Sequence, residues 1–450
     1  MKKKAMKNIL FNKHAILSLS LVVVHQSLIA LSALFLTQLI TAYQTGKPFA
    51  ASLFWYLFCM IIPFLPGCLS LVEMQKWTNH VHKNFIESVR SKCFARPDIY
   101  TNITLRNAIE SVISRNSFPI LSGFIAFIQG SLTFLLNSGL SLIVIGIILP
   151  NELILGYLLS VVISIACIVF LHKPIARETK KAEETFSGYG STLAKIWSNT
   201  ILGNVQNFNN WSNQATKAGD TYYAQSLRQI RLQQTGNLLL GILTLLPTAY
   251  LVYESLVSDT LHPAVAAAII VNLTRVFHIL NSLGTLVYQL LEWSAVKASY
   301  QFLFETMRNV GNDGPTADAP VRPIKINERE ISAYAEVKNQ LTEINCGRFT
   351  LRGENGSGKS TLLLYLKKHF ARNAFYLPAS MNELVWNTET GALSTGQSML
   401  AVLNEISTYP NIKYFLLDEW DANLDKDNKA KIHEMLDELS TKAVIVEVRH

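Results

Sequence analysis

Long apolar stretches are the feature that most constrains the fold of this chain. About twenty apolar residues in helical form cross a bilayer core of about 30 Å, and six stretches in the first two thirds of the sequence approach or exceed that length. They are His14–Tyr43, Ser52–Val72, Phe118–Leu149, Leu153–Leu171, Thr235–Tyr253 and Pro263–Leu291. The last two are more polar than the others. The sequence therefore predicts an α-helical membrane domain with six transmembrane helices.

The composition agrees with a membrane protein. Charged residues make up 16% of the chain, whereas about 25% is usual in soluble proteins. The formal net charge is +8, but the basic residues are not interleaved with aromatic ones, so we expect a lipid bilayer and no nucleic acid as partner. The five cysteines show no spacing that predicts a disulfide framework or a zinc site.

The segments between the apolar stretches differ in charge. Those after the second and fourth stretches are long, basic and helical in pattern, so we expect them to extend the spans as helices. The links after the third and fifth stretches are short and carry Glu152, Glu254 and Asp259 without Lys or Arg. The positive-inside rule then places both termini in the cytoplasm, with the chain in the cell inner (plasma) membrane. The first stretch continues past any plausible cleavage point, which favours an uncleaved span over a signal peptide.

A change of composition predicts a domain boundary. Residues 308–323 concentrate Gly, Pro and Asp, which is typical of a linker. We therefore expect a membrane domain over residues 1–307 and a separate domain over residues 324–450.

The C-terminal part contains "RGENGSGKST", which matches G-x-x-x-x-G-K-[ST] between a predicted strand and a predicted helix. Glycines in such a loop allow successive backbone N–H groups to surround phosphate oxygens. Lys359 would reach the β- and γ-phosphates, and the Ser360 hydroxyl would hold Mg²⁺. A glycine-rich turn without a ligand is the alternative, but it leaves Lys359 unexplained. The predicted nucleotide-binding residues here are Gly353, Glu354, Asn355, Gly356, Ser357, Gly358, Lys359, Ser360 and Thr361.

Two more motifs follow in the same part. The apolar strand in "KYFLLDEWD" ends in Asp418 and Glu419, where one carboxylate can hold Mg²⁺ and the other can orient or deprotonate a water molecule. Between this strand and the glycine-rich loop, "LSTGQ" opens a predicted helix, either as a phosphate site or with Ser394 as an ordinary N-cap. The order of the three motifs resembles the ATP-binding-cassette (ABC) family.

This resemblance implies a reduced α/β P-loop nucleotide-binding domain that uses ATP and Mg²⁺ as an ATPase coupled to transport. "LSTGQ" then resembles the signature loop, with Ser394, Gly396 and Gln397 as nucleotide-binding residues. "ANLD" resembles the D-loop with Asp425, and His450 resembles the switch histidine that acts beside Glu419. In this family each ATP lies between the P-loop of one cassette and the signature loop of another. A homodimer is therefore implied.

The layout of the six spans resembles the membrane half of an ABC exporter, so we expect export of a peptide-like or amphipathic small molecule. Trp420 after Glu419 resembles the subgroup that exports cyclic peptides and siderophore precursors. Ala379 stands where the family has a glutamine, and the short stretch from Ser360 to Ala392 leaves little room for the helical subdomain. We therefore expect another contact, from Asn382 or Glu383, to meet the basic helix ends around residues 96–115.

The cassette is short, so two alternatives stay open. The chain could be a degenerate, non-hydrolysing subunit paired with a related half-transporter. It could also be a nucleotide-binding membrane regulator that transports nothing.

The sixth apolar stretch carries polar side chains on one helical face, which would line a substrate cavity or bind neighbouring helices together. The arginine in this set would favour an anionic or carboxylate-bearing substrate. The set is Arg275, His278, Asn281, Ser282, Thr285 and Gln289.

Overall fold

The computed structural model describes residues 12–111, 117–148 and 151–257, isolated positions between 293 and 308, and residues 322–449 except 382–383, 390–392 and 423. The chain divides into two compact units. One comprises Met1–Glu87 and Ser111–Glu305, and the other comprises Ser88–Glu110 and Thr306–His450. Most of the predicted linker, residues 309–321, lies outside the described residues, so the predicted boundaries remain predictions.

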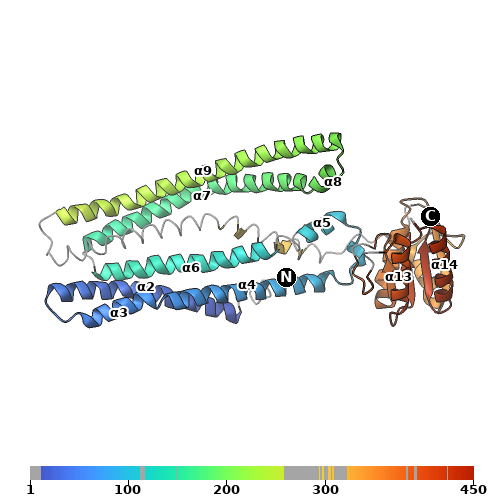
Figure 1. Cartoon of the computed structure of the whole chain (residues 1–450), viewed down its shortest axis with the longest axis horizontal. Coiled ribbons are helices and arrows are strands. Elements are labelled where there is room, and N and C mark those ends of the chain that lie inside the picture. The colour runs from blue at the N-terminus through green and yellow to red at the C-terminus, as the bar shows by residue number, and fades with distance from the viewer. Residues whose placement is uncertain are drawn as a thin grey trace. The chain divides into compact units, whose positions relative to one another are not determined.

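The first unit consists of helices in its described residues (Figure 1). They are α2 (Lys13–Gln44), α3 (Ala50–Ile61), α4 (Phe64–Cys93), which continues into the second unit, α6 (Ser117–Ile148), α7 (Asn151–Leu193), α8 (Ile196–Ile201) and α9 (Val205–Val257). The long segments α7 and α9 each continue without a break beyond the predicted apolar stretches. The basic connections therefore continue the helices in part, but α4 ends at Cys93 and α7 ends at Leu193 within them.

Four helices among the described residues are long and apolar enough to cross a membrane: Lys13–Gln44, Ala50–Cys93, Ser117–Leu140 and Val205–Glu254. They contain the first, second, third and fifth predicted spans, at least in part. The fourth predicted span lies within α7, and the sixth lies outside the described residues. Several long apolar helices indicate a multi-pass membrane protein.

Polar side chains join these helices in pairs. Helices α7 and α9 lie side by side (Figure 1), and the Glu178 carboxylate of α7, 7% exposed, accepts a hydrogen bond of 2.7 Å from Gln225 of α9. Between α2, α4 and α6, the Gln129 amide donates to the Ser18 hydroxyl at 3.2 Å and to the Ser70 carbonyl at 3.3 Å. The Gln129 bonds lie among the predicted spans, where they satisfy polar groups that lipid could not solvate.

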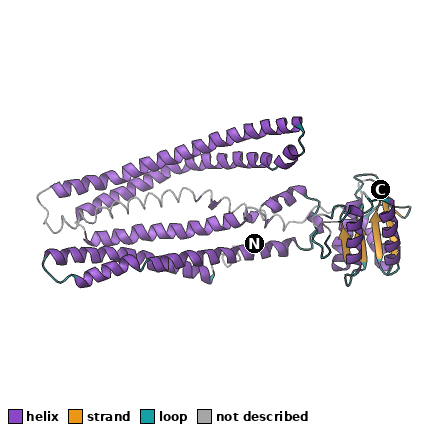
Figure 2. Cartoon of the chain, viewed as in Figure 1, coloured by secondary structure: helices purple, strands orange, loops and turns teal. Residues whose placement is uncertain are grey.

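The second unit contains the strands of the described part of the chain (Figure 2). The sheet has the order β2-β1-β3-β6-β5-β4. Its strands are β1 (Ile324–Ile326), β2 (Arg329–Ile331), β3 (Gly347–Gly353), β4 (Ala374–Leu377), β5 (Tyr414–Leu417) and β6 (Val444–Val448). β1 pairs antiparallel with β2 and β3, whereas β3, β6, β5 and β4 pair parallel. The four parallel strands therefore end at one edge.

Helices cover both faces of this sheet, since α11 (Tyr334–Glu343) and α12 (Lys359–Phe370) contribute to one apolar core and α13 (Thr395–Ser407) and α14 (Lys426–Ser440) to another. Every residue of β5 and β6 is buried, as expected for parallel strands covered on both sides. The short helices η1 (Pro97–Ile99) and α5 (Ile103–Ser111) lie in the segment after α4, and η3 (Ala371–Asn373) precedes β4. Ligands of open parallel sheets bind beyond the carboxyl ends of the strands, which is where the glycine-rich loop, Asp418 and Glu419 lie.

Candidate functional site

The glycine-rich loop joins the end of β3 to the start of α12. Gly356 and Gly358 have φ values of +76° and +105°, a region that side chains with a Cβ rarely adopt. Gly358 is the N-cap of α12, and no side chain caps that end. The first-turn N–H groups of a helix have no intrahelical partners. This helix N-terminus can therefore bind an anion such as phosphate.

Lys359 is folded into the loop. This lysine is only 8% exposed. Its Nζ donates hydrogen bonds to the carbonyl oxygens of Gly353 at 2.7 Å and Glu354 at 3.0 Å. Ser357 is fully buried, and its Oγ has no hydrogen-bond partner among the described residues. A Cβ on Gly353 would lie 2.9 Å from that Oγ, so this close packing requires glycine.

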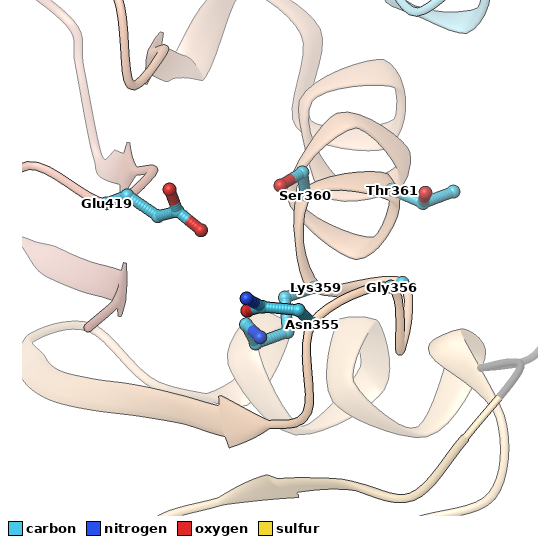
Figure 3. Close-up of a pocket in the computed structure, with 7 residues that line it drawn as sticks. Asn355, Gly356, Lys359, Ser360, Thr361 and Glu419 are labelled. Carbon is cyan, nitrogen blue, oxygen red and sulfur yellow. The ribbon is translucent and has the colours of Figure 1, made fainter. Parts of the chain in front are cut away.

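A cavity of about 420 Å³ opens at this loop, lined by Asn355, Gly356, Gly358, Lys359, Ser360, Thr361 and Glu419. In Figure 3 the Glu419 carboxylate and the Ser360 hydroxyl point toward the space between them, whereas Thr361 points away. Glu419 has φ +49°, which is costly for a residue with a side chain and is typical of functional sites. The cavity thus presents an ammonium group and a helix N-terminus opposite a carboxylate.

Asp418 lies beside this cavity at the end of β5. Its carboxylate accepts hydrogen bonds from the Ser360 hydroxyl at 3.1 Å (Oδ1) and from the Tyr376 hydroxyl at 2.9 Å (Oδ2). Burial raises the pKa of Asp418, and the bonds from Ser360 and Tyr376 oppose that rise. A hydroxyl and a carboxylate are hard oxygen donors of the kind that Mg²⁺ prefers. Ser360 and Asp418, predicted as metal ligands, therefore fit Mg²⁺ in position and chemistry.

A buried ion network lies behind Glu419. The Glu447 carboxylate of β6 is fully buried and accepts from Arg348 of β3 at 2.9 and 3.0 Å, from Arg449, and from the Trp420 indole at 2.8 Å. The Asp437 carboxylate of α14 accepts from Arg348 at 2.6 Å. The network therefore connects the strand before the glycine-rich loop to the residue after Glu419.

Other predicted residues cap helices. Ser394 accepts from the Gln397 N–H at 3.3 Å and donates its own N–H to the Gln397 side chain at 3.1 Å, which is a capping box at the start of α13. The Asp425 carboxylate caps α14 through Asn428. A Cβ on Gly396 would lie 2.5 Å from the Asn428 amide nitrogen, so glycine allows the two helix starts to touch. Within a single chain, Ser394 therefore acts as an ordinary N-cap residue.

The cavity does not include Ser394, Gly396, Gln397 or Asp425. Several other predicted residues lie outside the described part of the structure, and their roles remain predictions. They are His450, Arg275, His278, Asn281, Ser282, Thr285 and Gln289.

Sequence reasoning missed two groups near the cavity. Glu447 stands within the apolar run "AVIVEV", and a single charge in such a strand was a signal of a buried ionic contact. Tyr376 lies within β4, where no sequence pattern indicates a bond to Asp418, so only the fold reveals that contact. Both contact residues at the carboxyl ends of the parallel strands.

No family model matches the sequence, and no curated protein matches it. A solved structure of a bacterial Atm1-family ABC exporter with ATP bound is similar to this chain with a TM-score of 0.62. The similarity covers 97% of this chain and 90% of that exporter chain, at 14% sequence identity. The chain has the ABC exporter fold. The described residues contain the long apolar helices and the mixed six-stranded α/β sheet that are consistent with this fold.

Proposed function

We propose that this chain is an ABC half-transporter that works as a homodimer and uses ATP to export a peptide-like or amphipathic small molecule. The observation that supports this most is the cavity in which the glycine-rich loop, with Lys359, faces Glu419. Helix N-terminus, ammonium group and carboxylate are the parts that phosphoryl transfer to water requires. The ABC exporter fold and the several candidate membrane spans support the assignment of this site to a transporter.

Each residue of the site then has a role. The loop amides and Lys359 bind the phosphates, and Ser360 and Asp418 hold Mg²⁺, which would neutralise charge on the phosphate oxygens. Glu419 orients the attacking water and accepts its proton.

A second copy of the chain supplies the signature loop in this proposal. Ser394, Gly396 and Gln397 are absent from the cavity lining of their own chain, and Ser394 and Gln397 are exposed, so they are accessible to the cavity of a partner. The two nucleotide sites would then form between the copies, as the ABC resemblance implies. We also propose that the polar face with Arg275 in the sixth span contacts the substrate.

The test is ATP turnover by the full chain reconstituted in lipid nanodiscs. The unmodified protein should hydrolyse ATP in the presence of Mg²⁺, and Glu419→Gln should reduce kcat by at least about a hundredfold, as loss of a general base does, while ATP still binds. Asp427→Asn, in the first turn of α14, is the matched control and should hydrolyse ATP normally.

The outcomes separate the alternatives. Binding of ATP without turnover by the unmodified protein would contradict the homodimeric exporter and favour a degenerate subunit or a regulator. ATP turnover without ATP-dependent transport of any tested substrate into inverted vesicles would favour the regulator.

A further inference from the structure

The second oxygen of the Asp418 carboxylate is held by Tyr376. The Asp418 backbone is already fixed, because its N–H donates to the Leu377 carbonyl at 2.9 Å and β4 pairs with β5. Only the side-chain torsions remain free. The Tyr376 hydroxyl, 2.9 Å from Oδ2, restricts them and leaves Oδ1 toward Ser360.

The ring of Tyr376 packs against a residue from a distant part of the sequence. Tyr100 meets it edge to face, with ring centroids 5.9 Å apart and an interplanar angle of 79°. Tyr100 directly follows η1, which contacts α12. The Arg96 guanidinium binds the Asp98 carboxylate across the start of η1 at 2.8 and 2.9 Å, so this turn is rigid. Both tyrosines belong to the second unit.

The two contacts connect Tyr100 to Asp418 through Tyr376. Tyr100 limits where the Tyr376 ring can lie, the Tyr376 hydroxyl limits the orientation of the Asp418 carboxylate, and that carboxylate bonds Ser360 beside the cavity. Removing a residue that donates a hydrogen bond to a metal-ligating carboxylate commonly lowers metal affinity by about 10- to 100-fold. A shift of the segment after α4 would therefore alter metal binding.

We propose that Tyr376 is a positioning residue for Asp418 and that Tyr100 holds Tyr376 in place, so that the segment Ser88–Glu110 controls how tightly the cavity holds a divalent metal. This inference rests on the proposed function in one respect, the assignment of Asp418 as a metal ligand. It adds a regulatory connection between α4, which contains a candidate membrane span, and that ligand.

The first test measures metal binding without turnover. The full chain in nanodiscs is titrated with Mn²⁺ in the presence of a non-hydrolysable ATP analogue. The concentration of free Mn²⁺ is measured by electron paramagnetic resonance. Tyr376→Phe keeps the ring and removes the hydroxyl, so Mn²⁺ affinity should fall about tenfold, while the affinity for the analogue in EDTA should not change. Tyr414→Phe, which removes a buried hydroxyl bonded to the Leu341 carbonyl, is the matched control and should bind Mn²⁺ normally.

The second test addresses Tyr100. Tyr100→Ala removes the edge contact and should weaken Mn²⁺ binding in the same direction by a smaller factor, whereas Tyr100→Phe keeps the ring and should restore the unmodified affinity. Unchanged Mn²⁺ affinity in Tyr376→Phe would overturn the proposal. Unchanged affinity in Tyr100→Ala would overturn the part that concerns the segment after α4.

These readouts separate the inference from the proposed function. If the unmodified chain binds Mn²⁺ with the analogue but hydrolyses no ATP, the exporter proposal fails, and the Tyr376 comparison still decides the inference. If the chain hydrolyses ATP and Tyr376→Phe binds Mn²⁺ normally, only the inference fails. A chain that binds neither Mn²⁺ nor the analogue would contradict both.

Discussion

Glu447 shows at the residue scale how one side chain can bind several elements together. Burial would raise the pKa of this carboxyl, but the hydrogen bonds from Arg348 and Arg449 outweigh burial and hold the pKa below its usual value. Burial of an ion pair removes water from both charged groups, so a buried pair is stable only where each charge also makes good hydrogen bonds. Here the same carboxylate also accepts from Trp420, directly after Glu419. The network therefore restrains the backbone next to the proposed base.

Glu447→Gln should lower the stability of the second unit by about 3 kcal/mol, because it removes the fully buried carboxylate that two half-buried guanidinium groups share. Thermal unfolding of the full chain, followed by tryptophan fluorescence, measures the loss. Glu434→Gln changes an exposed carboxyl on the same side of the unit, on α14, and should unfold like the unmodified protein. Equal melting of both variants would show that the network adds no stability.

The same pair of proteins tests the pH dependence. A carboxyl with a lowered pKa in the folded state stabilises the fold above its unfolded pKa, about 4.3 for Glu, and loses this contribution as pH falls through the folded value. The melting difference between the unmodified protein and Glu447→Gln should therefore be constant from pH 7 to about pH 5 and narrow below that. A difference that grows toward acid pH would contradict the ionised state of Glu447.

At the element scale, the link from β4 to α13 depends on one side chain of α13. The described residues between 378 and 394 form no helix. The Glu405 carboxylate of α13 holds this link by accepting from the N–H groups of Asn387 at 3.1 Å and Thr388 at 3.0 Å. Hydrogen bonds from Tyr409 and then from these N–H groups lower the pKa of Glu405 to about 2. One ionised side chain thus restrains the loop at neutral pH.

Glu405→Gln should loosen this loop, since an amide accepts the same bonds less strongly and its NH₂ group opposes backbone N–H donors. Limited digestion with chymotrypsin should then cut several-fold faster after Leu384 and Trp386, beside Val385, which is 98% exposed. Mass spectrometry of the fragments identifies the cut. Glu438→Gln on α14 serves as the control with unchanged digestion, and equal rates in both variants would sink the argument.

At the scale of the whole molecule, two properties follow from the way the chain meets the membrane and a second copy. The positive-inside rule predicts that the turn between α2 and α3 faces outward and that the extension of α7 beyond its apolar part faces the cytoplasm. Thr45 and Lys180 are exposed in these two regions. They offer matched positions for testing the sidedness of the chain.

Single cysteines placed at these positions, in a chain whose native cysteines are replaced, should react differently with a membrane-impermeant maleimide. Thr45→Cys should label in intact cells, while Lys180→Cys should label only after the cells are opened, because the bilayer separates the two. Labelling efficiency is read from gel shift. The reverse pattern would overturn the proposed topology.

A mixture of two inactive chains tests the homodimer. Lys359→Ala removes the phosphate contact, and Ser394→Arg blocks the signature loop, so each homodimer should be inactive. In a mixed dimer, one site would carry both defects and the other neither, so coexpression should restore part of the ATP turnover. Turnover that stays absent in purified mixed dimers would show that the two motifs do not act across copies.

The sequence by itself determined the features that depend on local pattern. Apolar length predicted the long helices α2, α4, α6, α7 and α9, since the width of a bilayer sets that length. The spacing of glycines around Lys359 predicted the loop between a strand and a helix, because only residues without a Cβ adopt such backbone angles. Contacts between distant segments were decided by the tertiary structure. Tyr100 meets Tyr376, and Glu447 joins Arg348 to Trp420, because strand order brings these residues together, and no local pattern encodes strand order.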